Sequence, residues 1–267
     1  MTTELLDIDC GGFNLSALSL KDGAHGGEFC GEACMVEMAN RAAACIPALR
    51  EKYGAHDFTD NHPSISPVIR SFCVAFNDGL RSDEERDRLL KPFVTRILGT
   101  KTNKKDENIR AWMATDWLVR VQTAAWLDLA GKPEIAAKLR NLKPLTNAKI
   151  AQQSQSVIND ARDTADAAWD AARAAARAAA RDAAWDAARA AAWAAAWDAA
   201  RAAAGDAARA AARDAAWAAA WDAAGDAAWA AARDAAKKRL DPTVTELQVS
   251  ALDLLERMIA VGAKEVA

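Results

Sequence analysis

An alanine-rich repeat of four residues fills much of the second half of the chain and limits what that half can form. Residues 165–236 divide into 18 consecutive tetrads, each ending in Ala-Ala. The second position is only Asp or Ala, and the first is Trp in seven tetrads and Arg in eight. Alanine and arginine are strong helix formers, and no proline occurs between Pro144 and Pro242. The repeat therefore predicts a very long helix.

The period of this repeat argues against an ordinary coiled coil. Four residues at about 100° each move the Trp/Arg stripe about 40° around the helix per tetrad. A straight partner helix cannot follow that stripe, because even an 11-residue repeat needs only about 3.67 residues per turn. Three interpretations stay open: large side chains that contact different neighbours along the helix, local unwinding into π-type turns, and a solvated helix without a partner. We favour the first, because exposed tryptophans would form a large apolar surface.

The large side chains of the repeat are the candidate partner-binding residues. Trp and Arg at i and i+4 can stack, and Asp can pair with Arg at i+3. Gly205 lies near the middle of the repeat, where a turn would fold it into a hairpin. A ladder for aromatic or carbohydrate ligands and an ice-facing alanine surface are alternatives, but packing with repeat expansion is the simpler explanation. The candidates are Trp169, Trp185, Trp193, Trp197, Trp217, Trp221, Trp229, Arg173, Arg189 and Arg201.

Apolar residues at helical spacing, interrupted by proline and glycine, predict a helical domain over residues 28–150. The stretch around residues 107–130 is the most apolar, so we expect it at the centre of the domain. Residues 1–27 are expected to form an irregular arm that does not carry the fold. The expected helices are 31–53 with a kink at Pro47, 67–79, 83–98 behind an N-cap at Ser82, 107–130 and 133–142.

The C-terminal segment is expected to form a separate amphipathic helix that restarts at Asp241-Pro242. Its apolar face, with Leu254, Leu255 and Met258, needs a partner, either the N-terminal domain or another subunit. The chain is thus predicted to be all-α. Its expected parts are an arm over 1–27, a helical domain over 28–150, the repeat helix over 151–240 and the C-terminal helix over 241–267.

The composition disfavours several classes of partner. A formal net charge of −3 creates no field that would attract nucleic acid or an anionic membrane. The N-terminal sequence lacks a basic and apolar leader, and no window is long and apolar enough to span a bilayer, so we expect a cytoplasmic protein. All five cysteines lie in the first third of the chain and are expected to be reduced thiols.

Few residues suggest chemistry. Cys30 and Cys34, with Cys10 or His25, are a possible zinc set, but their spacing is irregular and structural cysteines are the better interpretation. His62 lacks a nucleophile motif beside it, so we interpret it as a loop histidine that caps a helix rather than a general base. Asp116 and Arg120 are four residues apart, as expected for an ion pair within a helix at the edge of the core rather than a buried site. We therefore expect no metal, no cofactor and no catalytic residue.

Several segments of the chain resemble a family of actinobacterial and phage-borne immunity proteins, predicted partners of polymorphic toxins. They are EACMVEMANRAA, DNHPSISPVI, ENIRAWMATDWLVRVQTAAWLDLAG, the alanine-rich repeat and LDPTVTELQVSALDLLERMIA. The resemblance covers most of residues 28–262, is clearest at RAWMATDWLVR and implies a toxin-neutralising binding role without catalytic residues. Our first hypothesis is therefore a non-enzymatic interaction protein. The alternatives are a structural protein whose repeat mediates homo-oligomerisation, and an enzyme or metal protein that uses the Cys/His-bearing first hundred residues.

Overall fold

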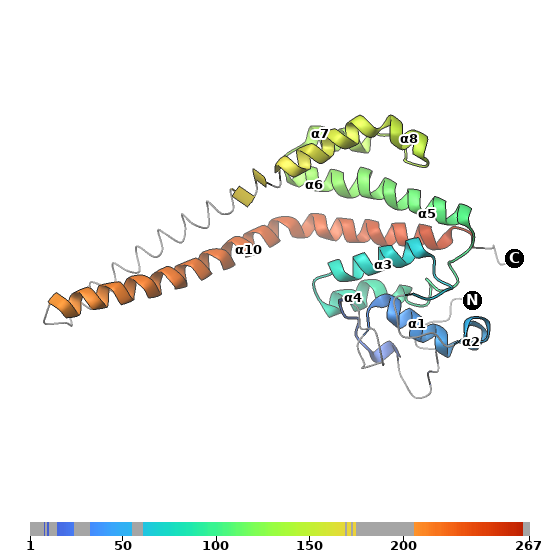
Figure 1. Cartoon of the computed structure of the whole chain (residues 1–267), viewed down its shortest axis with the longest axis horizontal. Coiled ribbons are helices and arrows are strands. Elements are labelled where there is room, and N and C mark those ends of the chain that lie inside the picture. The colour runs from blue at the N-terminus through green and yellow to red at the C-terminus, as the bar shows by residue number, and fades with distance from the viewer. Residues whose placement is uncertain are drawn as a thin grey trace. The chain divides into compact units, whose positions relative to one another are not determined.

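The part of the chain described by its structure, which is a computed structural model, consists mainly of α-helices joined by loops (Figure 1). The structure describes residues 8, 10, 15–23, 33–54, 61–168, 170–171, 173–174 and 206–263. For residues 206–229, 232 and 233 it describes the backbone alone. These residues contain no strand, which confirms the predicted all-α class. None of the described helices combines the length and the apolar character needed to cross a membrane.

The chain divides into two compact units. Unit 1 contains Met1–Gln122, Leu142–Ser154 and Gln248–Ala267, and unit 2 contains Thr123–Asn141 and Gln155–Leu247. Unit 1 contains a hydrophobic core that includes residues of α1, α3, α4 and the C-terminal helix.

The first expected helix is two helices. α1 spans Met35–Cys45 and α2 spans Pro47–Tyr53, with Ile46 extended between them at φ −84° and ψ 114°. Pro47 has no N–H to donate and its ring forces the preceding residue out of helical geometry. The predicted kink is therefore a complete break.

The next two helices begin where the sequence predicts. α3 spans Pro67–Gly79, and the side chain of its N-cap Ser66 accepts from the Ile69 N–H. α4 spans Asp83–Leu90 behind the N-cap Ser82. Our expectation that this helix continues to residue 98 is wrong, because Pro92 interrupts it and leaves a short 3₁₀ turn, η3, over Lys91–Phe93.

The apolar stretch that we expected at the centre of the domain lies at its edge. It forms α5 (Lys104–Trp117), a π-helical segment η4 (Leu118–Thr123) and α6 (Ala124–Leu129) in direct succession. This stretch carries apolar side chains on more than one side. Only some of them, such as Met113 and Trp117, pack against the core. Arg110 is the one buried residue of α5, so the expected central position is wrong.

The core of unit 1 joins segments from both ends of the chain. Leu254, Leu255 and Met258 of the C-terminal helix pack with residues of α1, α3 and α4. The N-terminal domain is therefore the partner of this apolar face. Leu20 is also part of this core, and Leu15, in the 3₁₀ turn η2 (Leu15–Ala17), is almost fully buried, so the arm contributes to the fold against our expectation.

α10 spans Asp206–Ala260 and passes through Pro242 without the restart that we predicted. Pro242 is exposed, so water can satisfy the carbonyl that loses its helical donor there. Residues 206–236 are α-helical, which excludes π-type turns in this half of the repeat. Residues 175–205, with the proposed turn at Gly205, lie outside the described residues.

Unit 2 contains a tight helical hairpin. α6 is joined to α7 (Pro133–Arg140) through Gly131 at φ 72°, and the Lys132 N–H donates to the Leu127 carbonyl at 2.8 Å. α7 confirms the helix predicted from residue 133. The Arg239 side chain of α10 donates to the Leu129 carbonyl at 3.3 Å within the same unit.

Candidate binding groove

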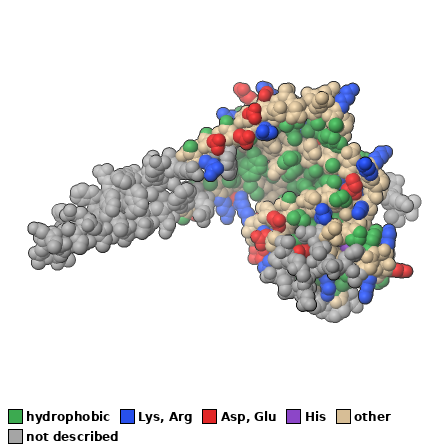
Figure 2. Space-filling model, viewed as in Figure 1, with side chains coloured by type: hydrophobic (Ala, Val, Ile, Leu, Met, Phe, Trp, Pro, Cys, Tyr) green, Lys and Arg blue, Asp and Glu red, His purple; other side chains and the backbone are tan. Residues whose placement is uncertain are grey.

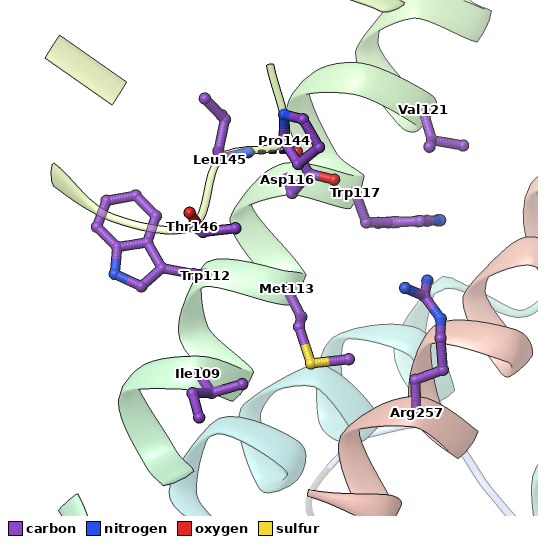
Figure 3. Close-up of a pocket in the computed structure, with 10 residues that line it drawn as sticks. All are labelled: Ile109, Trp112, Met113, Asp116, Trp117, Val121, Pro144, Leu145, Thr146 and Arg257. Carbon is purple, nitrogen blue, oxygen red and sulfur yellow. Dashed lines mark hydrogen bonds between the residues drawn. The ribbon is translucent and has the colours of Figure 1, made fainter. Parts of the chain in front are cut away.

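A hollow of about 390 Å³ lies on unit 1, between α5, the segment around Leu145 that precedes α8 (Ala148–Gln153), and Arg257 of α10 (Figure 3). Its volume falls within the range of ligand pockets, which is about 300–1,000 Å³. Most of its lining is apolar. The lining residues are Ile109, Trp112, Met113, Asp116, Trp117, Val121, Pro144, Leu145, Thr146 and Arg257.

Hydrogen bonds hold the segments that form the two walls of this groove. The Asp116 carboxylate accepts from the Leu145 N–H at 2.7 Å, which ties the 144–146 segment to α5. Trp117 donates from its indole N–H to the Ser250 hydroxyl at 2.8 Å, and its ring meets Phe72 edge-on at 6.1 Å. The groove is therefore formed before any ligand arrives.

Asp116 also forms the ion pair that the sequence predicted. Arg120 lies 3.3 Å from its carboxylate, and the two side chains are about a quarter exposed, at 24% for Arg120 and 26% for Asp116. This confirms the ion pair at the edge of the core over the alternative of a buried site.

Large apolar side chains of α5 and η4 are exposed, both within the groove and elsewhere on the surface of these helices. Leu118 is 51% exposed, Ile109 40% and Val121 37%. Figure 2 shows hydrophobic side chains gathered in the region where α5 lies. The π segment changes the helical register after Trp117, so the apolar pattern no longer keeps to one buried face. We call the two of these residues that line the groove, Ile109 and Val121, the apolar strip.

One positive side chain, Arg257, lines the groove. Arg257 points from α10 toward Trp117 (Figure 3), and its Nε donates to Asp253 at 2.9 Å. Lys143 and Lys149 are exposed on either side of the 144–146 segment, and within the described part of the chain neither makes an ion pair. The carboxylate inside the groove, Asp116, is already used by Arg120 and the Leu145 N–H.

Behind the groove, a buried arginine of α5 holds the end of α10. Arg110 is fully buried and donates to the carbonyls of Met258 at 3.0 Å and Val261 at 2.6 Å. It also pairs with Glu107 at 2.8 Å. A helix leaves its last carbonyls without partners in the helix itself, and a cation there is favoured by the helix dipole. Sequence reasoning missed this role; the available signal was a single arginine among apolar residues.

A second buried arginine, Arg86 of α4, caps the C-terminal end of α3 in the same way. Arg86 donates to the carbonyls of Asn77 at 3.0 Å and Leu80 at 2.8 Å, at the C-terminal end of that helix, and pairs with Asp83. Both arginines therefore serve the fold rather than a ligand.

His62 is placed as a structural residue. It is 3% exposed, its Nδ1 lies 2.7 Å from the Ser64 hydroxyl and accepts from the Ser64 N–H at 3.2 Å. Its ring packs edge-on against Tyr53. These contacts favour a loop histidine that organises the turn before α3 over a general base.

The cysteines only partly meet our expectation. Cys10 and Cys45 form a disulfide, so our prediction of reduced thiols is wrong for these two. The arm returns to the end of α1, a proximity that sequence spacing does not reveal. Cys34 and Cys73 are buried free thiols, and burial raises the pKa of Cys73 to about 12.

The structure does not assemble the suggested zinc set. Cys10 is used in the disulfide, while Cys30 and His25 lie outside the described residues. Cys34 is the N-cap of α1, where its N–H donates to Glu37 at 2.8 Å. Across the described residues no group of three or more His, Cys, Asp or Glu side chains is arranged to hold a metal ion.

The candidate residues of the repeat are described only in part. Arg173 is exposed on a helical segment, and no ion pair joins it to the described Asp170. The other predicted residues fall into two groups. The backbone alone is described for Trp217, Trp221 and Trp229 on α10, and outside the described residues lie Trp169, Trp185, Trp193, Trp197, Arg189 and Arg201.

Comparisons with known proteins identify no relative: no family model, curated protein or solved structure matches the chain. The resemblance to immunity proteins therefore stays a prediction from the sequence. The functional argument depends on the groove itself.

Proposed function

We propose that the protein is a non-enzymatic interaction module, of the immunity type, that binds a protein partner through the groove and the apolar strip. The observation that carries the proposal is the exposed strip along a groove whose walls are already fixed. Its two residues, Ile109 at 40% and Val121 at 37% exposure, remain open to solvent. Contiguous apolar surface at the edge of a preformed pocket is typical of protein-binding sites.

The toxin-like nature of the partner comes from the sequence resemblance alone. A groove of this kind fits it, because neutralisation by binding requires surface complementarity and no chemistry. The Trp/Arg stripe of the repeat remains a predicted second contact surface.

Homo-oligomerisation through the repeat is the alternative. The described half of the repeat is regular α-helix, so its stripe turns by about 40° per tetrad and does not match a straight partner helix. Light scattering separates the two proposals: a monomer of 28.5 kDa contradicts assembly, and a stable oligomer that persists on dilution contradicts the interaction-module proposal.

The proposed cytoplasmic setting is in tension with one observation. Disulfides persist in oxidising compartments and are rare in the cytosol. The Cys10–Cys45 disulfide therefore argues for an oxidising setting or for reduction of this pair in the cell.

Co-expression tests the proposed function. The chain is expressed with each toxin-like protein encoded near its gene, and cell growth and complex formation are measured. Wild type is expected to form a complex and restore growth, and the double variant Ile109→Glu/Val121→Glu is expected to lose both. An exposed apolar residue of the same unit, Val249 at 64%, supplies the control Val249→Glu. Absence of any complex with wild type, or full protection by the double variant, would contradict the proposal.

A further inference from the structure

We infer that the Cys10–Cys45 disulfide is a redox-operated latch: a dithiol reductant opens it and frees the arm around Cys10 from the end of α1, while the rest of unit 1 stays folded. This inference is independent of the proposed binding of a partner. It follows from the accessibility of the two cysteines, from the few contacts that hold the arm beside them, and from the separate attachment of the chain further on.

The disulfide is open to solvent, unlike the other cysteines that the structure describes. Cys10 and Cys45 are each partly exposed, whereas Cys34 and Cys73 are buried free thiols. Reduction requires attack of a thiolate on a disulfide sulfur, so its rate depends on access to that sulfur. Burial also raises the pKa of Cys73 to about 12, which keeps this thiol from competing in exchange. Among the described cysteines, redox chemistry is therefore directed to one pair.

Little besides the disulfide holds the arm against the end of α1. Ile8 is buried in a small apolar cluster with Leu15 and Ala42, against which Cys10 also packs. No hydrogen bond joins Ile8 or Cys10 to another described segment. One buried isoleucine contributes less free energy than the ordering of a few backbone residues costs. Without the covalent bond, the contacts of Ile8 are therefore too weak to keep this part of the arm in place.

The chain beyond the latch is attached by contacts of its own. The Leu20 N–H donates to the Asp87 carboxylate at 2.7 Å, and the Leu20 side chain belongs to the core of unit 1. The Lys21 N–H donates to the Ala33 carbonyl at 3.0 Å, and its ammonium group pairs with Asp83 at 2.5 Å. Leu20 and Lys21 therefore stay bound to the domain when the disulfide opens, and the release is limited to the segment before them.

The opening step is a thiol–disulfide exchange. One thiolate of the reductant attacks a sulfur of the pair and forms a mixed disulfide, which the second thiol of the reductant then resolves. The reductant leaves as a disulfide, and Cys10 and Cys45 each gain one electron and one proton to become thiols. Release of Ile8 and Cys10 uncovers part of the apolar cluster around Ala42. The reduced protein thus presents apolar surface at the end of α1 that the oxidised protein covers.

The test follows thiol labelling and amide hydrogen exchange in the oxidised full-length protein, before and after dithiothreitol is added without denaturant. Trypsin places Cys10, Cys45 and Cys73 in three different peptides, residues 1–21, 42–50 and 71–81, so alkylation is measured separately for each. Cys10 and Cys45 are expected to become alkylated after reduction, and Cys73 to stay protected until the protein is unfolded. The amides of residues 8, 10 and 42–46 are expected to exchange at least about tenfold faster after reduction, with those of α3 and α5 unchanged.

Two variants check the assignment. Cys10→Ser/Cys45→Ser is expected to exchange at the fast rate with and without dithiothreitol. The matched control Cys73→Ala leaves the pair intact and is expected to keep the wild-type response. Circular dichroism confirms that each variant is folded.

Four results would overturn the inference. The oxidised protein yields no linked peptide of residues 1–21 and 42–50, or the pair resists reduction until denaturant is added. The reduced protein exchanges no faster at the end of α1, or the amides of α3 and α5 exchange faster as well. The last result would make the disulfide a brace for the whole unit and not a latch for the arm.

Discussion

Removal of the buried Arg110 guanidinium tests whether α5 and the end of α10 are held together by the contacts described above. In Arg110→Met the side chain keeps much of its apolar bulk, but the Val261 carbonyl loses its donor, the Met258 carbonyl keeps only the Val261 N–H, and Glu107 loses its cation. Arg110 is fully buried, whereas the Glu107 side chain is 20% exposed, so water reaches only part of the defect.

The expected cost is about 3–5 kcal/mol, the usual range for a buried ion pair that loses one partner. The orphaned Val261 carbonyl is part of this figure, since an unpaired carbonyl costs about 1–3 kcal/mol when no water replaces the donor. A matched control is Arg257→Met on α10, whose pair with Asp253 is exposed and is expected to contribute only about 0.3–0.5 kcal/mol.

The assay is urea unfolding followed by tryptophan fluorescence, with hydrogen exchange of the amides near Met258 as a local readout. The Arg110 variant should unfold at clearly lower urea, and the terminal turns of α10 should exchange faster. The variant Arg110→Lys is expected to fall between wild type and Arg110→Met, because an ammonium group cannot reproduce a planar two-carbonyl contact. A loss below about 1 kcal/mol, comparable to the Arg257 control, would refute this reasoning.

Three further predictions concern the backbone, a buried thiol and the disulfide. Gly262→Ala should destabilise the protein by at least about 1–2 kcal/mol in thermal unfolding, because the φ of Gly262 is 72° and the new Cβ would lie 2.3 Å from the Asp106 carboxylate. Adding Asp106→Ala should remove the clash but not the cost of the positive φ. The raised pKa of Cys73 means that the unfolded thiol ionises first, so the free energy of unfolding should fall as the pH rises from 9.0 to about 12, and Cys73→Ala should flatten that slope. Reduction of Cys10–Cys45, which closes a loop of 35 residues, should lower stability by up to about 4 kcal/mol; unchanged melting with a reductant, or free thiols at both positions by mass spectrometry, would contradict this.

Local signals in the sequence predicted the helices best. Ser82 caps α4 as expected, and α3 begins at Pro67 as expected, since these signals depend on a few neighbouring residues. The errors at Pro92 and Pro242 have opposite causes: Pro92 ended a helix that the apolar pattern seemed to continue, and Pro242 was tolerated because it is exposed. The effect of a proline thus depends on tertiary surroundings that the sequence pattern does not contain.

The groove was beyond the reach of sequence reasoning for a related reason. Periodicity identified the apolar residues of the stretch around 107–130 but not which of them face the core. Two non-local facts decide this, the bond from Leu145 to Asp116 and the packing of Trp117 against Phe72. The disulfide between Cys10 and Cys45 is non-local in the same way.

Arg110 and several lining residues of the groove belong to the same helix, α5. This arrangement affects how tightly the groove can bind a partner. Arg110 holds the Met258 carbonyl, and the adjacent residue Arg257 is the cation that borders the groove. The opposite wall is held by Asp116. A site whose walls are positioned by buried bonds loses little conformational freedom on binding, so more of the contact energy appears as affinity. The buried arginine is therefore a positioning residue for the proposed interface as well as a cap for α10.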